Sequence, residues 1–163
     1  MNDETLEKFL GELGALNPTI QAISRGEDPS SWYISMGEDD EAETIAVGVY
    51  HREEERKLVL IAGLVVPDEQ NEHATYEALL TFNSLWTETS GQRMALDEDG
   101  LPTLLMDITL PGLTAEALSE AVEEFAIRAL SWAFMLMDGG VSEAEEPQDA
   151  EVEQTTPENV LRV

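Results

Sequence analysis

Few side chains in this sequence could perform catalysis or hold a metal ion. The chain has no cysteine, which excludes a thiolate nucleophile, a disulfide and a cysteine-ligated metal. Its two histidines, His51 and His73, lack a second histidine at metal-ligand spacing, and a histidine acid–base site needs converging partners. We therefore interpret both histidines as solvated side chains.

The familiar catalytic motifs are also missing. The sequence contains no G-x-S-x-G, no phosphate-binding glycine loop with lysine and no G-x-G-x-x-G. Carboxylates are so numerous that a close pair says little about glycosidase chemistry. Asp97 and Asp99 fit two positions of an EF-hand loop, but the later ligands and flanking helices are missing, so Gly100 indicates a hairpin turn. We predict no enzyme activity, no metal and no cofactor.

The composition indicates a folded binding protein with an acidic surface. Its 163 residues suit one domain, and a hydrophobic fraction of 42% suffices for a core. The net charge of -27 repels phosphate backbones and anionic lipids, so we predict a protein partner, with no nucleic acid and no membrane. Residues 1–13 do not resemble a signal peptide and no apolar run could span a membrane, which predicts a cytoplasmic location.

The first half of the chain predicts one helix followed by three strands. From Asn2, apolar residues recur at the i, i+3, i+4, i+7 spacing of a helix stripe, and Asn17-Pro18 ends that pattern. Three apolar segments follow, separated by charged or turn-forming connections, at residues 32–36, 44–50 and 58–66. Their short connections favour an antiparallel meander.

The second half predicts a helix, a hairpin and a long final helix. The middle helix extends past Trp86 until Gly91 stops it, and strands at residues 92–96 and 103–110 flank the Asp-Gly turn. Thr114 is placed to cap a last helix that ends at Asp138. The fold class is therefore α+β, in the order α-β-β-β-α-β-β-α, with an antiparallel or mixed sheet backed by helices.

One folded domain, residues 1–140, and an acidic tail, residues 141–163, account for the chain. The tail is rich in acids and proline, poor in large apolar residues and aperiodic, so we predict that it is disordered.

Some apolar residues exceed what a core of this size needs. Five of them gather near the first predicted edge of the sheet: Phe9, Trp32, Tyr33, Ile34 and Met36. Phe82 and Trp86 lie on the middle helix, and six methionines add adaptable apolar surface. Most of these side chains are expected to fill the core. A homodimer interface and a peptide groove compete for the remainder.

The sequence resembles the class I type III secretion chaperone family, also called the Tir-chaperone or CesT-like fold. The resemblance covers the element order from Asp3 to about Met137. It includes a local pattern of LLTFN on the middle helix, MALDEDG in the hairpin, and a strand at residues 104–110 before a helix opened by LTAE.

That resemblance implies an ATP-independent homodimer that holds the N-terminal segment of a secretion substrate in extended form. In the family, the first helix and first strands meet the substrate. The resemblance therefore nominates a client-binding set of Leu6, Phe9, Leu10, Leu13, Trp32, Ile34 and Met36. The middle helix and adjoining strand form the family's dimer, which nominates Leu79, Phe82, Asn83, Trp86 and Met94 for the dimer interface.

Two other functions stay open at this point. YbjN-like proteins share the fold, and the chain could act like them as a regulatory or adaptor protein on a cytosolic partner. The charge alone also allows an acidic decoy for a basic nucleic-acid-binding surface, in which case binding would depend on salt and not on apolar residues.

Overall fold

The computed structural model describes residues 3–37, 44–67, 69–85 and 87–137. The structure leaves undescribed residues 38–43, which belong to the acidic connection at residues 37–43 between two predicted strands, together with Trp86 and the predicted tail. Among the described helices, none is long and apolar enough to cross a membrane.

The first predicted helix is confirmed as α1 (Asp3–Leu16). Leu6, Leu10 and Leu13 form its buried stripe, and each is 0% exposed. After the helix, the Asn17 side chain accepts hydrogen bonds from the Thr19 backbone N–H at 2.9 Å and from the Thr19 hydroxyl at 2.7 Å. The Asn17 amide also donates to Glu123 at 3.1 Å, which ties the end of α1 to the last helix.

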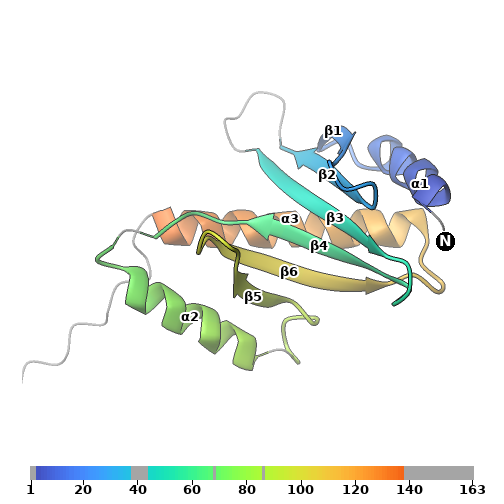
Figure 1. Ribbon diagram of the computed structural model, residues 1–163. Coiled ribbons are helices and arrows are strands. Elements are labelled where there is room, and N and C mark those ends of the chain that lie inside the picture. The colour runs from blue at the N-terminus through green and yellow to red at the C-terminus, as the bar shows by residue number, and fades with distance from the viewer. Residues whose placement is uncertain (1–2, 38–43, 68, 86, 138–163) are drawn as a thin grey trace, which may run out of the picture.

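Six antiparallel strands form a single sheet in the order β1-β2-β3-β4-β6-β5 (Figure 1). The strands are β1 (Ile20–Arg25), β2 (Ser31–Met36), β3 (Ile45–Arg52), β4 (Lys57–Gly63), β5 (Arg93–Leu96) and β6 (Pro102–Thr109). The meander and the later hairpin are therefore both present, and the α+β class is confirmed.

Strand β1 was not predicted, and it moves the edge of the sheet. It pairs outside β2, so the expectation that residues 32–36 form the first edge is wrong. A bulge between Ile20 and Ala22 places Ile20 and Ile23 opposite Met36 and Ile34. Because the bulge breaks the period of two, the sequence of β1 does not alternate as an ordinary strand does.

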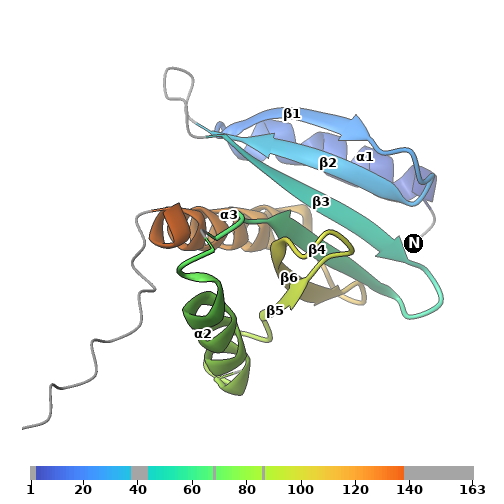
Figure 2. The same ribbon diagram turned by 60° about the vertical axis from the view of Figure 1, so that its left-hand side comes forward.

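Two helices cover one face of the sheet. Helix α1 packs on β1, and α3 (Ala115–Met137) packs on β3 and β4 and contacts α1 (Figure 2). The predicted cap of α3 is confirmed, because the Thr114 hydroxyl accepts from the Ala117 N–H at 3.2 Å. Phe125 is 0% exposed at the centre of the α3 contact, with Val122 and Ala129 beside it in the core.

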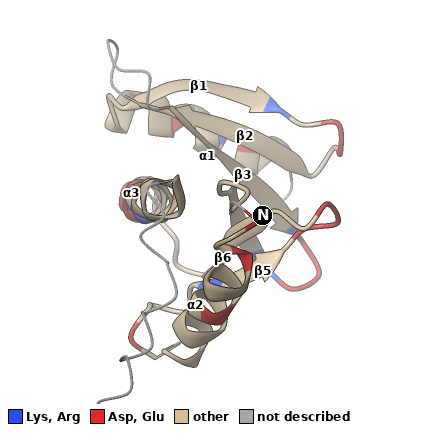
Figure 3. Cartoon of the chain, turned by 90° about the vertical axis from the view of Figure 1, so that its left-hand side faces the viewer, with Lys and Arg blue, Asp and Glu red and all other residues tan. Residues whose placement is uncertain are grey.

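Helix α2 (Glu72–Ser84) lies beside β5 and is shorter than predicted. It ends at Ser84, whose hydroxyl donates to the Thr81 carbonyl at 2.7 Å. Leu85 and residues 87–91 form turns, so the helix does not continue to Gly91. Acidic side chains are frequent in the turns between strands, as Glu27, Asp28 and residues 53–55 illustrate (Figure 3). The acidic charge of the described residues is thus carried mainly at the surface.

Candidate binding surfaces

The structure places the predicted client-binding residues mostly in the interior. Six of the seven are buried in the core, and Phe9 is partly buried against it: the six are Leu6, Leu10, Leu13, Trp32, Ile34 and Met36. A molecule that approaches α1 and β1 from outside would therefore contact the residues that cover this buried set. The covering residues include Ile20 and Ile23 of β1, which are partly buried, and Leu16 at the end of α1, which is 46% exposed.

Strand β1 offers an open edge to a further strand. Among the described segments, none pairs with its outer side. The Gly26 N–H donates to the Ser31 carbonyl at 2.9 Å, and in an antiparallel pair the bonded positions alternate. The main-chain groups of Ile23 and Arg25 therefore point away from β2, free to pair with an incoming chain.

Arg25 fixes the end of this edge. Its guanidinium lies 5.6 Å from the Trp32 ring centroid, donates to the Pro29 carbonyl at 2.8 Å and pairs with Glu7 of α1 at 3.3 Å. These contacts tie β1, the β1–β2 turn and α1 together, so the edge is held in place before any partner binds.

The opposite edge, β5, is closed by a side chain. Asn83 of α2 accepts from the Met94 N–H at 2.7 Å and donates to the Met94 carbonyl at 3.0 Å. The amide thus imitates the pairing of a neighbouring strand and occupies the outer main-chain N–H and carbonyl of Met94, in a strand only four residues long. Asn83 was nominated for the dimer interface, and the structure gives it this contact within the chain.

We expect Asn83→Leu to lower the free energy of unfolding by about 1–3 kcal/mol, because two main-chain groups lose their partners and no water replaces them well. Urea unfolding followed by circular dichroism measures this. Hydrogen exchange at the Met94 amide should accelerate in the variant. Asn83→Asp, which keeps the acceptor and loses the donor, is the matched control and should retain part of the stability. An unchanged unfolding midpoint in Asn83→Leu would contradict the role assigned to the amide.

The surface of α2 and β5 carries an exposed apolar group. Leu80 is 71% exposed on α2, while Leu85 and Leu96 are 43% and 46% exposed. Two nominated interface residues, Leu79 and Met94, are buried beneath this surface. We call the surface formed by Leu80, Leu85 and Leu96 the α2–β5 face.

Phe82, also nominated for the interface, joins α2 to the last helix. Its ring meets that of Trp132 edge to face, with centroids 5.5 Å apart. This contact and the Asn83 amide hold α2 from two sides, so the α2–β5 face is presented by a helix in a defined position.

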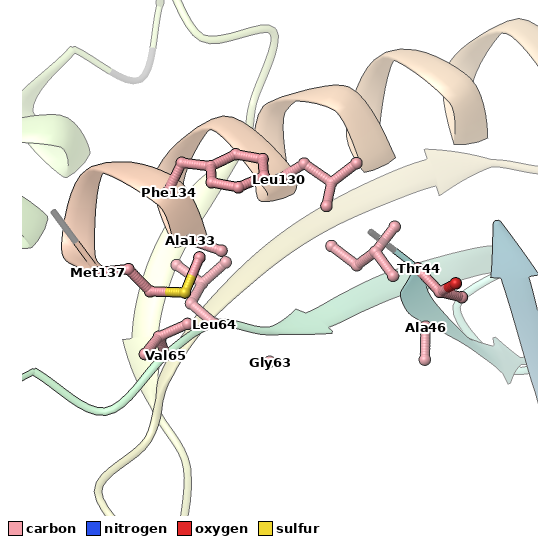
Figure 4. Close-up of a pocket in the computed structure, with 10 residues that line it drawn as sticks. Thr44, Ala46, Gly63, Leu64, Val65, Leu130, Ala133, Phe134 and Met137 are labelled. Atoms are coloured by element: carbon pink, nitrogen blue, oxygen red, sulfur yellow. The ribbon is translucent and has the colours of Figure 1, made fainter. Parts of the chain in front are cut away.

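A groove opens between the sheet and the C-terminal end of α3 (Figure 4). Its volume is about 440 Å³. One wall comes from the last two turns of α3 and the other from the start of β3 and the end of β4. The lining residues are Thr44, Ile45, Ala46, Gly63, Leu64, Val65, Leu130, Ala133, Phe134 and Met137. This lining is suited to apolar side chains, and it offers no ionisable group for chemistry.

The clustered charges of the described residues are structural. Asp107 on β6 accepts from Arg93 at 2.7 Å and from Lys57 at 3.0 Å. Partial burial of Asp107 opposes its ionisation, but these hydrogen bonds outweigh burial and hold its pKa below the usual value. Glu55 and Asp107 raise the pKa of Lys57. Each partner is thereby held in its charged form, which suits an ion pair and not a proton donor.

The histidines and acids do not assemble a metal site within the described residues. His51 is buried at 5% exposure, so the interpretation of it as a solvated side chain is wrong; His73 is exposed. The Asp97 carboxylate accepts from the Asp99 and Leu101 N–H groups at 3.0 and 2.8 Å, and Gly100 has a φ of 81°. The Asp-Gly segment is therefore a hairpin turn, as predicted.

Sequence reasoning missed three features of these surfaces: the β1 edge, the exposure of Leu80 and the groove. The groove joins residues from β3, β4 and α3, which no local pattern places together. A weak signal for β1 was present, because Ile20 and Ile23 lie between Pro18 and Gly26, two residues that often bound a strand.

Comparison with curated proteins gives no match. Several solved structures match this chain, and two of them illustrate the shared fold. The ExsC–ExsE complex aligns with a TM-score of 0.62 and 21% identity, over 82% of this chain and 95% of that chain. The HopA1–SchA chaperone–effector complex aligns with a TM-score of 0.60 and 16% identity, over 81% of this chain and 95% of that chain. The model of the Tir chaperone protein (CesT) family matches residues 41–133, more than half of the sequence, so the chain belongs to that family.

Proposed function

We propose that this protein is an ATP-independent type III secretion chaperone that works as a cytoplasmic homodimer and binds the N-terminal segment of a secreted protein. Family membership is the observation that carries the proposal. The two structures of the same fold are described as complexes, one of them as a chaperone with its effector. A binding role also fits surfaces that offer a strand edge and apolar contacts.

The client is proposed to bind at the β1 edge. An extended segment gains main-chain hydrogen bonds from Ile23 and Arg25, and its side chains contact apolar groups next to the edge. Phe9 and Leu16 of α1, with Ile20 and Ile23 of β1, supply these apolar contacts. The buried members of the client-binding set support this surface from below, and their role in client binding stays a prediction.

The homodimer is proposed to form through the α2–β5 face. Leu80 is 71% exposed. This is high for a leucine on a helix that the Phe82 ring and the Asn83 amide hold against the rest of the chain. Burying Leu80, Leu85 and Leu96 against a second copy would remove apolar area from water on both subunits.

The function is tested by capture of the client and reconstitution. The full chain is used as bait in its native host, and captured proteins are identified by mass spectrometry. Purified N-terminal and C-terminal parts of the main captured protein are then titrated calorimetrically with the chaperone, with and without ATP. We expect binding of the N-terminal part only, with an affinity that ATP does not change.

Two outcomes would contradict the proposal. Binding to a folded cytosolic protein through a surface outside its N-terminal segment would favour a regulatory or adaptor role. Binding that vanishes with added salt and is indifferent to Leu16→Asp would favour the acidic decoy.

A further inference from the structure

We propose that, contrary to the disorder predicted for the whole tail, residues 160–163 of this same chain occupy the groove at the end of α3 in the free protein. The sequence there is Val-Leu-Arg-Val. The proposal concerns occupancy of the groove by the chain itself, so it does not require the chaperone function to hold.

The position of the groove favours an occupant from the following residues. Met137, the last residue of α3, forms part of the wall, and Phe134 lies one turn before it (Figure 4). The chain continues for 26 residues beyond Met137, at positions 138–163. These residues therefore start at the groove that they are proposed to fill.

The chemistry of residues 138–163 changes sharply near position 160. All eight acids of this segment fall at positions 138–158, whereas residues 160–163 contain three large apolar side chains and no acid. Arg162 is the only basic residue of the segment. An apolar groove would take Val160, Leu161 and Val163 in preference to the acidic residues before them.

The connection after α3 is long enough for residues 160–163 to reach the groove. Residues 138–159 form a 22-residue link, for which a flexible chain has a root-mean-square span of roughly 26 Å. Attachment through such a link corresponds to an effective concentration on the order of mM, so a weak contact suffices for substantial occupancy.

Paramagnetic relaxation tests the proposal on the full chain. Because the protein has no cysteine, Asn159→Cys accepts a nitroxide label at one position only. We expect the label to broaden the amide signals of Ala46, Gly63 and Val65, and to leave that of Gly26 at the other end of the sheet unchanged. Adding Leu161→Asp should abolish the broadening.

A matched pair of variants tests the groove side. Met137→Asp alters the wall and should remove the broadening, whereas Met135→Asp, which is 40% exposed on the same helix and does not line the groove, should preserve it. A mixed sample distinguishes docking within one chain from docking onto a second copy. It combines nitroxide-labelled chains without isotope enrichment and isotopically enriched chains without nitroxide. Broadening in that mixture equal to that in the single protein would overturn occupancy by the same chain. Uniform or undetectable broadening in the parent protein would overturn docking altogether.

Discussion

Leu80→Asp is expected to convert the protein from a dimer to a monomer, raising the dimer dissociation constant by about 100-fold or more. In the dimer interface, the carboxylate would lose its water without gaining a partner, which costs several kcal/mol. The contact that Leu80 makes with the second subunit would be lost at the same time. Sedimentation equilibrium should give twice the 18.0 kDa chain mass for the parent and the single mass for the variant.

Leu16→Asp is the matched control for this experiment. Leu16 is also exposed, but it lies at the end of α1, away from the α2–β5 face. The control should remain dimeric, and circular dichroism should show that both variants are folded. A dimeric Leu80→Asp protein, or a monomeric parent, would exclude the α2–β5 face as the dimer interface.

Ile23→Pro is expected to weaken binding of the client segment by up to about tenfold, because proline has no N–H to donate and the incoming strand loses a main-chain hydrogen bond worth about 0.5–1.5 kcal/mol. The Ile23 amide points away from β2, so the internal ladder between β1 and β2 keeps its bonds. Titration calorimetry with the captured N-terminal segment measures the change.

Ile23→Ala separates main-chain pairing from side-chain packing. It removes the same apolar contacts against Ile34 and keeps the amide, so it should bind the client much better than the proline variant. Equal affinities for the alanine and proline variants would show that the client does not pair with the edge of β1.

The fold could be predicted where each element has a local signal. The stripe of Leu6, Leu10 and Leu13, the Thr114 cap and the Asp-Gly turn all depend on residues close in sequence, and the structure confirms them. Strand β1 was missed because its bulge removes the alternation. Helix α2 was extended too far because Leu85 and Trp86 continue the apolar pattern of the sequence beyond Ser84.

The candidate surfaces were predicted less well, for a different reason. Apolar type alone does not distinguish a core residue from an exposed one: Ile34 is 0% exposed, whereas Leu80 is 71% exposed. Asn83 could be identified as important from its place in the helix-Asn-hairpin pattern, but its bonds to Met94 join residues that only the tertiary fold brings together.

The closed edge at β5 has a consequence for how many molecules can assemble through this sheet. A sheet with two open edges can add copies of itself without limit and grow into a fibre. Here the Asn83 amide occupies the outer main-chain groups of Met94 on β5, so β1 is the edge left open to strand addition among the described strands. Assembly through strands therefore terminates after a single addition, and we expect one extended segment per subunit in any saturated complex.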